Sequence, residues 1–153
     1  MAVDAAIKHS VSGSEIQSAF DIFAPMDEQL NPQKPKSLNR EKGKAGEKMA
    51  VEYLLAKGYT IERLNWKGNG YEIDIIAKHN QTIVFVEVKA RGGTFFGWPE
   101  KAVNKAKQQH ISKAADHFID LFKIENEIRF DIISIVTNRL QNEIYHIEDA
   151  FVP

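Results

Sequence analysis

The sequence contains no cysteine, which excludes disulfide bonds, thiolate zinc sites and a cysteine nucleophile. It also lacks a long apolar run, because its apolar stretches are only a few residues long and a membrane-spanning helix needs about 20. The segment from Met1 to Ser10 carries Asp4, Lys8 and His9 without an apolar core, which argues against a secretory signal. We therefore expect a cytoplasmic protein with no membrane partner.

The chain has little net charge, since 20 basic and 21 acidic side chains give a formal charge of −1 at pH 7. The charge of the whole molecule therefore offers no argument for nucleic-acid binding. The five histidines show no paired metal-ligand spacing, so no zinc site is predicted. A length of 153 residues with 43% hydrophobic side chains is enough for one domain with a buried core.

Proline is scarce and concentrated near the start of the chain, where Pro25, Pro32 and Pro35 are three of the five. Residues 1–36 show no strand pattern, and we interpret them as a flexible N-terminal extension rather than a separate functional element. Regular patterns begin after this segment, so a folded domain is predicted at residues 37–153.

From position 39 onward the sequence shows helical and strand patterns. Asn39 suits the N-cap and Gly58 the C′ position of one helix, and Pro99 suits the first turn of another. Asn80-Gln81 indicates a short turn that joins two strands in an antiparallel hairpin. The predicted elements are a helix at 40–56, strands at 59–66, 71–78 and 82–90, a helix at 99–122, and strands at 129–137 and 142–147. The order α-β-β-β-α-β-β predicts an α/β sandwich, with a mixed central β-sheet flanked by helices.

Two of the predicted strands are largely apolar but carry charged side chains. By strict alternation, Glu72, Asp74 and Ile76 share one face of the second strand, while Glu87 and Lys89 share one face of the third. A Glu-x-Lys pair alone is common on strands as a solvated ion pair. Burying an unpaired charge is costly, however, so charges on buried strands are usually paired or bound to a metal. The coincidence on neighbouring strands favours a shared site.

A further carboxylate comes from the first predicted helix. Glu47, Ala50, Val51 and Leu54 fall at i, i+3, i+4 and i+7, so they share one face that is otherwise apolar. Taken alone, this spacing is also compatible with a Glu47 that borders the face and reaches solvent. Together with Asp74, Glu87 and Lys89, it makes four charged side chains directed at the interior.

These residue types point to metal-assisted chemistry on phosphodiesters. Asp74, Glu87 and Glu47 offer the hard oxygen ligands that Mg²⁺ or Mn²⁺ prefers, and one or two carboxylates with water suffice for Mg²⁺. A divalent cation lowers the pKa of a bound water and clamps phosphate oxygens, which are the two needs of phosphodiester hydrolysis. Lys89 would orient the water or stabilise developing charge. The pattern predicts a catalytic site made of Asp74, Glu87, Lys89 and Glu47.

A run of short motifs extends from Gly43 to Phe151. They are Gly43-Lys44-Ala45-Gly46-Glu47, Ala50, Tyr53-Leu54, Gly58-Tyr59, Asn65, Glu72-Ile73-Asp74-Ile75-Ile76-Ala77, Val84-Phe85-Val86-Glu87-Val88-Lys89, Arg91, Phe96-Gly97, Pro99, Lys107, Arg129-Phe130-Asp131 and Ala150-Phe151. With these motifs the chain resembles the UPF0102 (YraN-like) family over nearly the whole predicted domain. One departure is Tyr71, which separates Gly70 from Glu72 where the family usually reads Gly-Glu-Ile-Asp.

The resemblance implies a place in the PD-(D/E)XK nuclease superfamily, with the restriction-endonuclease-like fold that archaeal Holliday-junction resolvases also have. It implies that Asp74, Glu87 and Lys89 form the superfamily core and that Glu47 is the helix carboxylate. DNA, branched or otherwise processed, is the implied partner, and Mg²⁺ or Mn²⁺ the implied cofactor. Cleavage of a four-way junction would also require a homodimer with two sites.

A local excess of basic residues supports a nucleic-acid partner. Between positions 89 and 113, a single acid (Glu100) is set against six basic residues, which are Lys89, Arg91, Lys101, Lys105, Lys107 and Lys113. We predict nucleic-acid contacts at Arg91, Lys101, Lys105 and Lys107. For Lys101 and Lys105 a solvated helix face is an alternative interpretation, whereas Lys107 falls on the apolar face of its helix.

Aromatic side chains at positions 95, 96 and 98 lie in a glycine-containing loop before the second predicted helix. They are suited to stacking on bases, and equally to packing under the sheet. Three functions fit the sequence as a whole. The first is a metal-dependent endonuclease, the second a non-catalytic nucleic-acid-binding protein that keeps the nuclease fold, and the third a structural network of buried charges.

Overall fold

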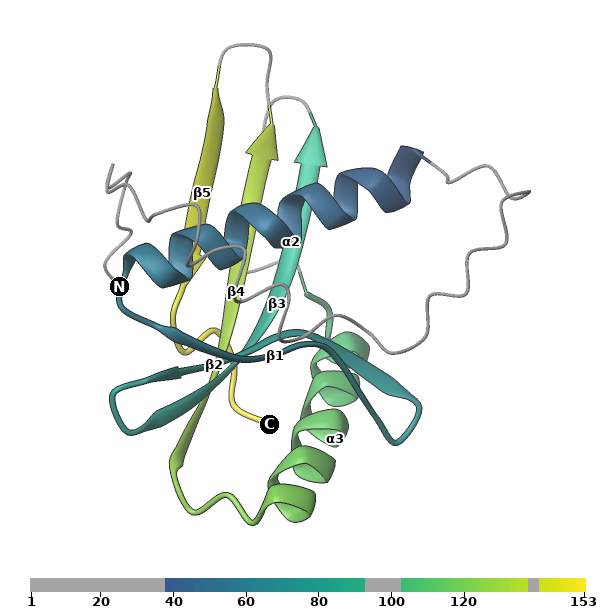
Figure 1. The fold of residues 1–153 in the computed structure, drawn as a ribbon. Helices are drawn as coiled ribbons and strands as arrows, with labels where there is room; N and C mark the ends of the chain where they lie inside the picture. The colour runs from purple at the N-terminus through teal and green to yellow at the C-terminus, as the bar shows by residue number, and fades with distance from the viewer. Residues whose placement is uncertain (1–37, 93–102, 138–140) are drawn as a thin grey trace, which may run out of the picture.

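The computed structural model describes residues 38–92, 103–137 and 141–153. The predicted extension at 1–36, the aromatic loop, Pro99 and Lys101 lie outside these ranges. The described elements are α2 (Leu38–Ala56), β1 (Thr60–Gly68), β2 (Tyr71–His79), β3 (Thr82–Gly92), α3 (Lys105–Phe122), β4 (Glu127–Thr137) and β5 (Asn142–Ile147). The predicted order α-β-β-β-α-β-β is confirmed (Figure 1).

The five strands form one mixed sheet in the order β1-β2-β3-β4-β5. All neighbouring pairs are antiparallel except β3 and β4, which run parallel, and α3 lies between them in the sequence. A parallel pair needs such a crossover connection because both strands run in the same direction. The predicted hairpin is confirmed, since His79 pairs with Thr82 across Asn80-Gln81.

The two helices cover opposite faces of the sheet, so the predicted sandwich is confirmed (Figure 1). One core cluster joins α3 to the sheet through Ile111, Phe118, Phe85 and their neighbours. The other joins α2 to the opposite face through Val51, Leu54 and the inward side chains of β2, β3 and β4. Each helix is therefore fixed to its face of the sheet by the burial of apolar side chains.

The helix ends differ in part from the sequence prediction. The predicted C′ residue Gly58 is confirmed: it has φ +83°, and the amides of Gly58 and Tyr59 donate to the carbonyls of Leu55 and Leu54. Asn39 is wrong as an N-cap because the helix already includes it. The second helix begins at Lys105 instead of near Pro99, since the Asn104 side chain caps it by accepting from the Lys107 amide at 2.9 Å.

Strict alternation fails within β2. Ile73 and Ile76, which alternation places on opposite faces, both belong to the cluster against α3. Ile75 packs on the α2 face. The inward and outward pattern is therefore interrupted around Asp74, at the point where β2 stops pairing with β3. This interruption is the local feature on which the polar site is built.

A glycine sets how closely α2 approaches the sheet. A Cβ atom on Gly46 would lie 2.5 Å from the Cβ of Ala90 in β3, so only a glycine lets the helix pass here without displacement. The next residue, Glu47, is thereby held close to the end of β3. A Cβ atom added to Gly43, one turn earlier, would meet nothing within 4 Å.

Substitution of Gly46 by Ala is expected to lower the free energy of unfolding by about 1–2 kcal/mol, because the overlap with Ala90 outweighs the gain in helix propensity. Gly43→Ala is the matched control. It should stabilise the protein by up to about 1 kcal/mol, since its added methyl group meets open space in a helix interior. Urea denaturation of both variants measures the difference, and equal effects of the two substitutions would contradict a close contact at Gly46.

Candidate active site

The site begins where two central strands separate. The β2–β3 ladder ends at the pair Ile75 and Val86, and the next residue of β2 is Asp74. Its Oδ2 atom accepts a hydrogen bond of 2.8 Å from the amide of Val88 in β3. A side-chain carboxylate thus replaces the backbone carbonyl as the partner of this amide. Asp74 is therefore held by the sheet itself, between the two layers of helices.

Glu87 lies on β3 and is only 2% exposed. Its Oε1 atom is 2.6 Å from the Lys89 ammonium group, two residues along the same strand. Its Oε2 atom is 3.1 Å from the ammonium group of Lys107, which comes from the first turn of α3. The Oε2 contact is an ion pair without hydrogen-bond geometry, so this buried oxygen has no hydrogen-bond partner.

Glu47 reaches the site from α2. Its Oε2 atom accepts a 3.2 Å hydrogen bond from the Asn65 side chain of β1, whose backbone has φ 50°. Burial raises the pKa of Glu47, with the Asn65 hydrogen bond opposing and the charges of Glu72 and Glu87 adding to the rise. The sequence did not single out Asn65 as a partner of Glu47, because a strand–helix contact over 18 residues leaves no spacing signal.

A polar pocket of about 460 Å³ brings these groups together. All four predicted catalytic residues line it, and the other lining residues are Lys42, Gly43, Val88 and Ala90. Glu72, which shares β2 with Asp74, is exposed and does not line the pocket. Lys42 is a lining residue that sequence reasoning missed, since nothing distinguished it from a solvated helix lysine.

The pocket concentrates negative charge in a poorly solvated place. Burial, followed by the charge of Glu87, raises the pKa of Asp74 to about 7, although the Val88 amide and Lys107 oppose the rise. A carboxylate whose ionised form is disfavoured by burial and by a neighbouring carboxylate is a setting in which a divalent cation is favourable. The donor set consists of carboxylate oxygens, and Glu87 Oε2 lacks a hydrogen bond, so the chemistry fits Mg²⁺ or Mn²⁺ with water as further ligand.

Within the described ranges, no three His, Asp or Glu side chains are arranged so that together they could hold a metal ion directly. A cation would therefore be held by one or two carboxylates with several waters, which is the usual coordination of Mg²⁺ in proteins. Lysine ammonium groups balance the charge of Glu87 in this structure.

The predicted nucleic-acid contacts are placed unequally. Arg91 at the end of β3 and Lys105 at the start of α3 are exposed. Lys107 is partly buried because it points to Glu87.

Neither described helix is both long and apolar enough to span a membrane.

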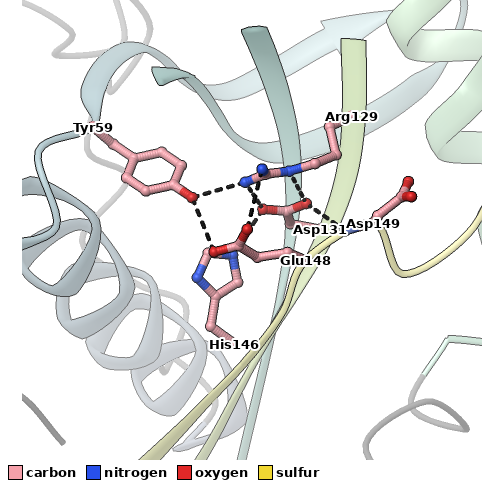
Figure 2. Close-up of polar contacts among 6 residues, drawn as sticks. All are labelled: Tyr59, Arg129, Asp131, His146, Glu148 and Asp149. Atoms are coloured by element: carbon pink, nitrogen blue, oxygen red, sulfur yellow. Dashed lines mark hydrogen bonds and ion pairs between the residues drawn. The ribbon is translucent and has the colours of Figure 1, made fainter. Parts of the chain in front are cut away.

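A second polar cluster lies beside the C-terminal end of α2, on β4, β5 and the residues after them. Figure 2 shows its members, which are Tyr59, Arg129, Asp131, His146, Glu148 and Asp149. The Arg129 guanidinium donates two 2.8 Å hydrogen bonds to the carboxylate of Asp131, and a third of 2.7 Å to the Tyr59 hydroxyl. Arg129 also forms an ion pair of 3.2 Å with Glu148.

Asp131 is the centre of this second cluster and is 1% exposed. Besides Arg129, it contacts His146 Nε2 at 2.8 Å and accepts from the amide of Asp149 at 3.0 Å. Burial alone would raise the pKa of Asp131, but the hydrogen bonds from His146 and Arg129 hold it below its usual range. A carboxylate satisfied on this many sides ties β4 to β5 and to the turn after β5. We assign the cluster a structural role.

Comparison with known proteins identifies the family of this chain. The fold is an α/β sandwich whose central strands separate around an acidic pocket. The model of the family described as "Uncharacterised protein family UPF0102" matches residues 46–135, and the chain belongs to this family. The match includes Glu47, Asp74, Glu87 and Lys89 as well as Asp131.

Individual relatives cover most of the domain. A UPF0102 protein of Bacteroides thetaiotaomicron is 43% identical over 115 residues, which is 75% of this chain and 95% of the relative. One of Thermodesulfovibrio yellowstonii is 47% identical over 72% of this chain and 96% of its own length. One of Persephonella marina is 46% identical over 72% of this chain and 92% of its own length.

Proposed function

We propose that this protein is a divalent-metal-dependent endonuclease of the PD-(D/E)XK superfamily that acts on DNA, with branched or processed DNA as the substrate class. The observation that carries the proposal is the convergence of Asp74, Glu87, Lys89 and Glu47 on one pocket, from two strands and a helix. These side chains come from positions 47 to 89, and a purely structural ion network has no need of a solvent-accessible pocket beside it.

Each residue has a separate task in this proposal. Asp74 and Glu87 would hold Mg²⁺ or Mn²⁺, and Glu47 would assist from α2. The bound cation would supply a water of lowered pKa and would neutralise charge on the phosphate. Lys89 donates to Glu87 at 2.6 Å, which leaves its ammonium group beside the pocket, where it orients the attacking water or stabilises developing charge.

Exposed basic side chains near the pocket would bind the phosphate backbone of DNA. Arg91 is exposed and follows Ala90, which lines the pocket. Lys105 is exposed in the first turn of α3, the turn from which Lys107 reaches Glu87. Such groups attract the phosphate backbone without reading sequence. Cleavage at a four-way junction would need two copies of this chain, each contributing one pocket.

The direct test is incubation of the purified protein with labelled single-stranded, duplex, flap and four-way-junction DNA, in Mg²⁺, Mn²⁺ or EDTA. Cleavage that requires the metal supports the proposal and identifies the preferred DNA structure. The absence of cleavage on every substrate in both metals would contradict it.

Metal binding should also raise the thermal stability of the protein in the absence of DNA. At about 100 times its Kd, Mn²⁺ adds about 2.7 kcal/mol to the free energy of unfolding, which raises Tm by several degrees. EDTA should reverse the rise, and Asp74→Asn should abolish it. Thermal denaturation monitored by circular dichroism measures this, and an unchanged Tm of the parent protein at millimolar Mn²⁺ would argue against a metal site.

One observation favours a second candidate function, nucleic-acid binding without cleavage. Glu87 is already paired with the ammonium groups of Lys89 and Lys107, so this carboxylate is charge-balanced without a metal ion in this structure. A protein of this kind would bind the same DNA panel equally well in Mn²⁺ and in EDTA and would cut none of it.

A further inference from the structure

The charge balance of Glu87 depends on two different elements. Lys89 belongs to the same strand and makes a hydrogen bond of good geometry to Oε1. Lys107 crosses from α3 and lies 3.1 Å from Oε2, as an ion pair without hydrogen-bond geometry. The Lys107 contact is therefore the weaker of the two, and it occupies the carboxylate oxygen that is otherwise unsatisfied.

Lys107 is also in an unfavourable position within its own helix. Asn104 is the N-cap of α3, so Lys107 is the third residue of the first turn, which contains no acidic residue. The N-terminus of a helix carries partial positive charge, which favours acidic side chains there and disfavours lysine. The ion pair with Glu87 offsets this cost, so the position of Lys107 depends on the charge of the carboxylate in the pocket.

A divalent cation entering the pocket would remove that support. It would use a Glu87 oxygen, and its two positive charges would repel the Lys107 ammonium group at the same carboxylate. The lysine stem is flexible and its side chain is 33% exposed, so the ammonium group is able to leave without unfolding the helix. Once released, it lies at a helix N-terminus that already favours anions.

We propose that Lys107 is the resident counter-ion of Glu87, which yields its place to a divalent cation and then holds a phosphate of the nucleic acid. This inference rests on the proposed function. It adds that metal binding and DNA binding are coupled through one side chain, because the lysine becomes available to phosphate only when the metal has replaced it.

The first test is isothermal titration of Mn²⁺ into the full chain without DNA. Lys107→Gln should bind Mn²⁺ about tenfold more tightly than the parent, because the competing ammonium group is gone. Lys105→Gln, an exposed lysine in the same helical turn, is the matched control for the loss of a charge and should change the Mn²⁺ affinity by less than about twofold. Lys107→Arg, which keeps the positive charge, should stay near the parent affinity.

The second test measures the affinity for a labelled duplex by fluorescence anisotropy, with EDTA or with saturating Ca²⁺. Lys107→Gln should weaken binding about tenfold in Ca²⁺, because one phosphate contact is lost, and by less than about twofold in EDTA, where Glu87 holds the lysine. Lys105→Gln should weaken binding by the same factor in both conditions.

The outcomes separate this inference from the proposed function. Mn²⁺ affinity that is unchanged or weaker in Lys107→Gln overturns the inference alone, as does an equal loss of DNA affinity with and without cation. If the parent protein and every variant fail to bind Mn²⁺, both the inference and the proposed function are overturned. Should Lys107→Gln fail to fold, Lys107→Met keeps the aliphatic stem and gives the same comparison, with the same result required.

Discussion

Asp74→Asn and Glu87→Gln are each expected to reduce metal-dependent DNA cleavage by about 10³-fold, since each removes the charge of a carboxylate that would hold the cation. Both substitutions preserve shape, and Asn retains an oxygen that can accept from the Val88 amide. The fold should therefore persist, and unfolding curves of the variants should remain cooperative. Initial rates on the preferred DNA, at saturating Mn²⁺, measure the effect.

Glu72→Gln is the matched control for this experiment. Glu72 lies on the same strand as Asp74, but it is exposed and does not line the pocket. Its substitution should leave cleavage close to the parent rate. Comparable cleavage by Asp74→Asn, Glu87→Gln and the parent would show that the pocket is not the catalytic site, whatever nuclease activity the preparation has.

The second large effect is expected on stability. Asp131→Asn should lower the free energy of unfolding by about 3 kcal/mol at pH 7, because it removes the charge that compensates Arg129 in a buried network. Asp149→Asn makes the same chemical change at an exposed side chain whose backbone amide still reaches Asp131. It should cost no more than about 0.5 kcal/mol. Urea denaturation of the two variants provides the comparison.

The acid limb of the stability curve gives an independent check of the same network. The pKa of Asp131 is lower in the folded protein than the value of about 3.9 in an unfolded chain, so its ionised form stabilises the fold above that pH. This contribution is lost as the pH falls through the folded pKa. The parent protein should therefore lose stability on acidification more steeply than Asp131→Asn, and parallel curves would contradict the assignment.

The fold was largely accessible from the sequence because its signals are local. Period-two and helical patterns gave the seven described elements in the right order, and Gly58 gave the end of the first helix. The start of α3 was misplaced because Pro99 was assigned to its first turn, and Asn104, whose side chain makes the capping bond, was not considered. Strict alternation also failed at Asp74, where β2 stops pairing with β3, because the sequence carries no signal of where two strands separate.

The candidate site was predictable in its members and less so in its geometry. Four charged residues were predicted on faces that should be buried, and their occurrence together predicted a shared site. All four line one pocket. Their partners were hidden because contacts between α2 and β1, or between α3 and β3, depend on tertiary packing. Asn65 was therefore not recognised as a partner of Glu47, and Lys42 was not recognised as a pocket residue. The role of Lys107 as a partner of Glu87 emerged only from the distance between their charged groups.

The hydrogen bond from Val88 to Asp74 has a practical consequence for spectroscopy. In a regular ladder the shift of an amide proton reports backbone geometry, but this amide donates to a titratable side chain in the pocket. Its resonance will therefore respond to any change in the charge or position of that carboxylate, whether a proton, a metal ion or a substrate causes it. Val88 supplies an internal NMR reporter of the pocket that needs no label beyond ¹⁵N.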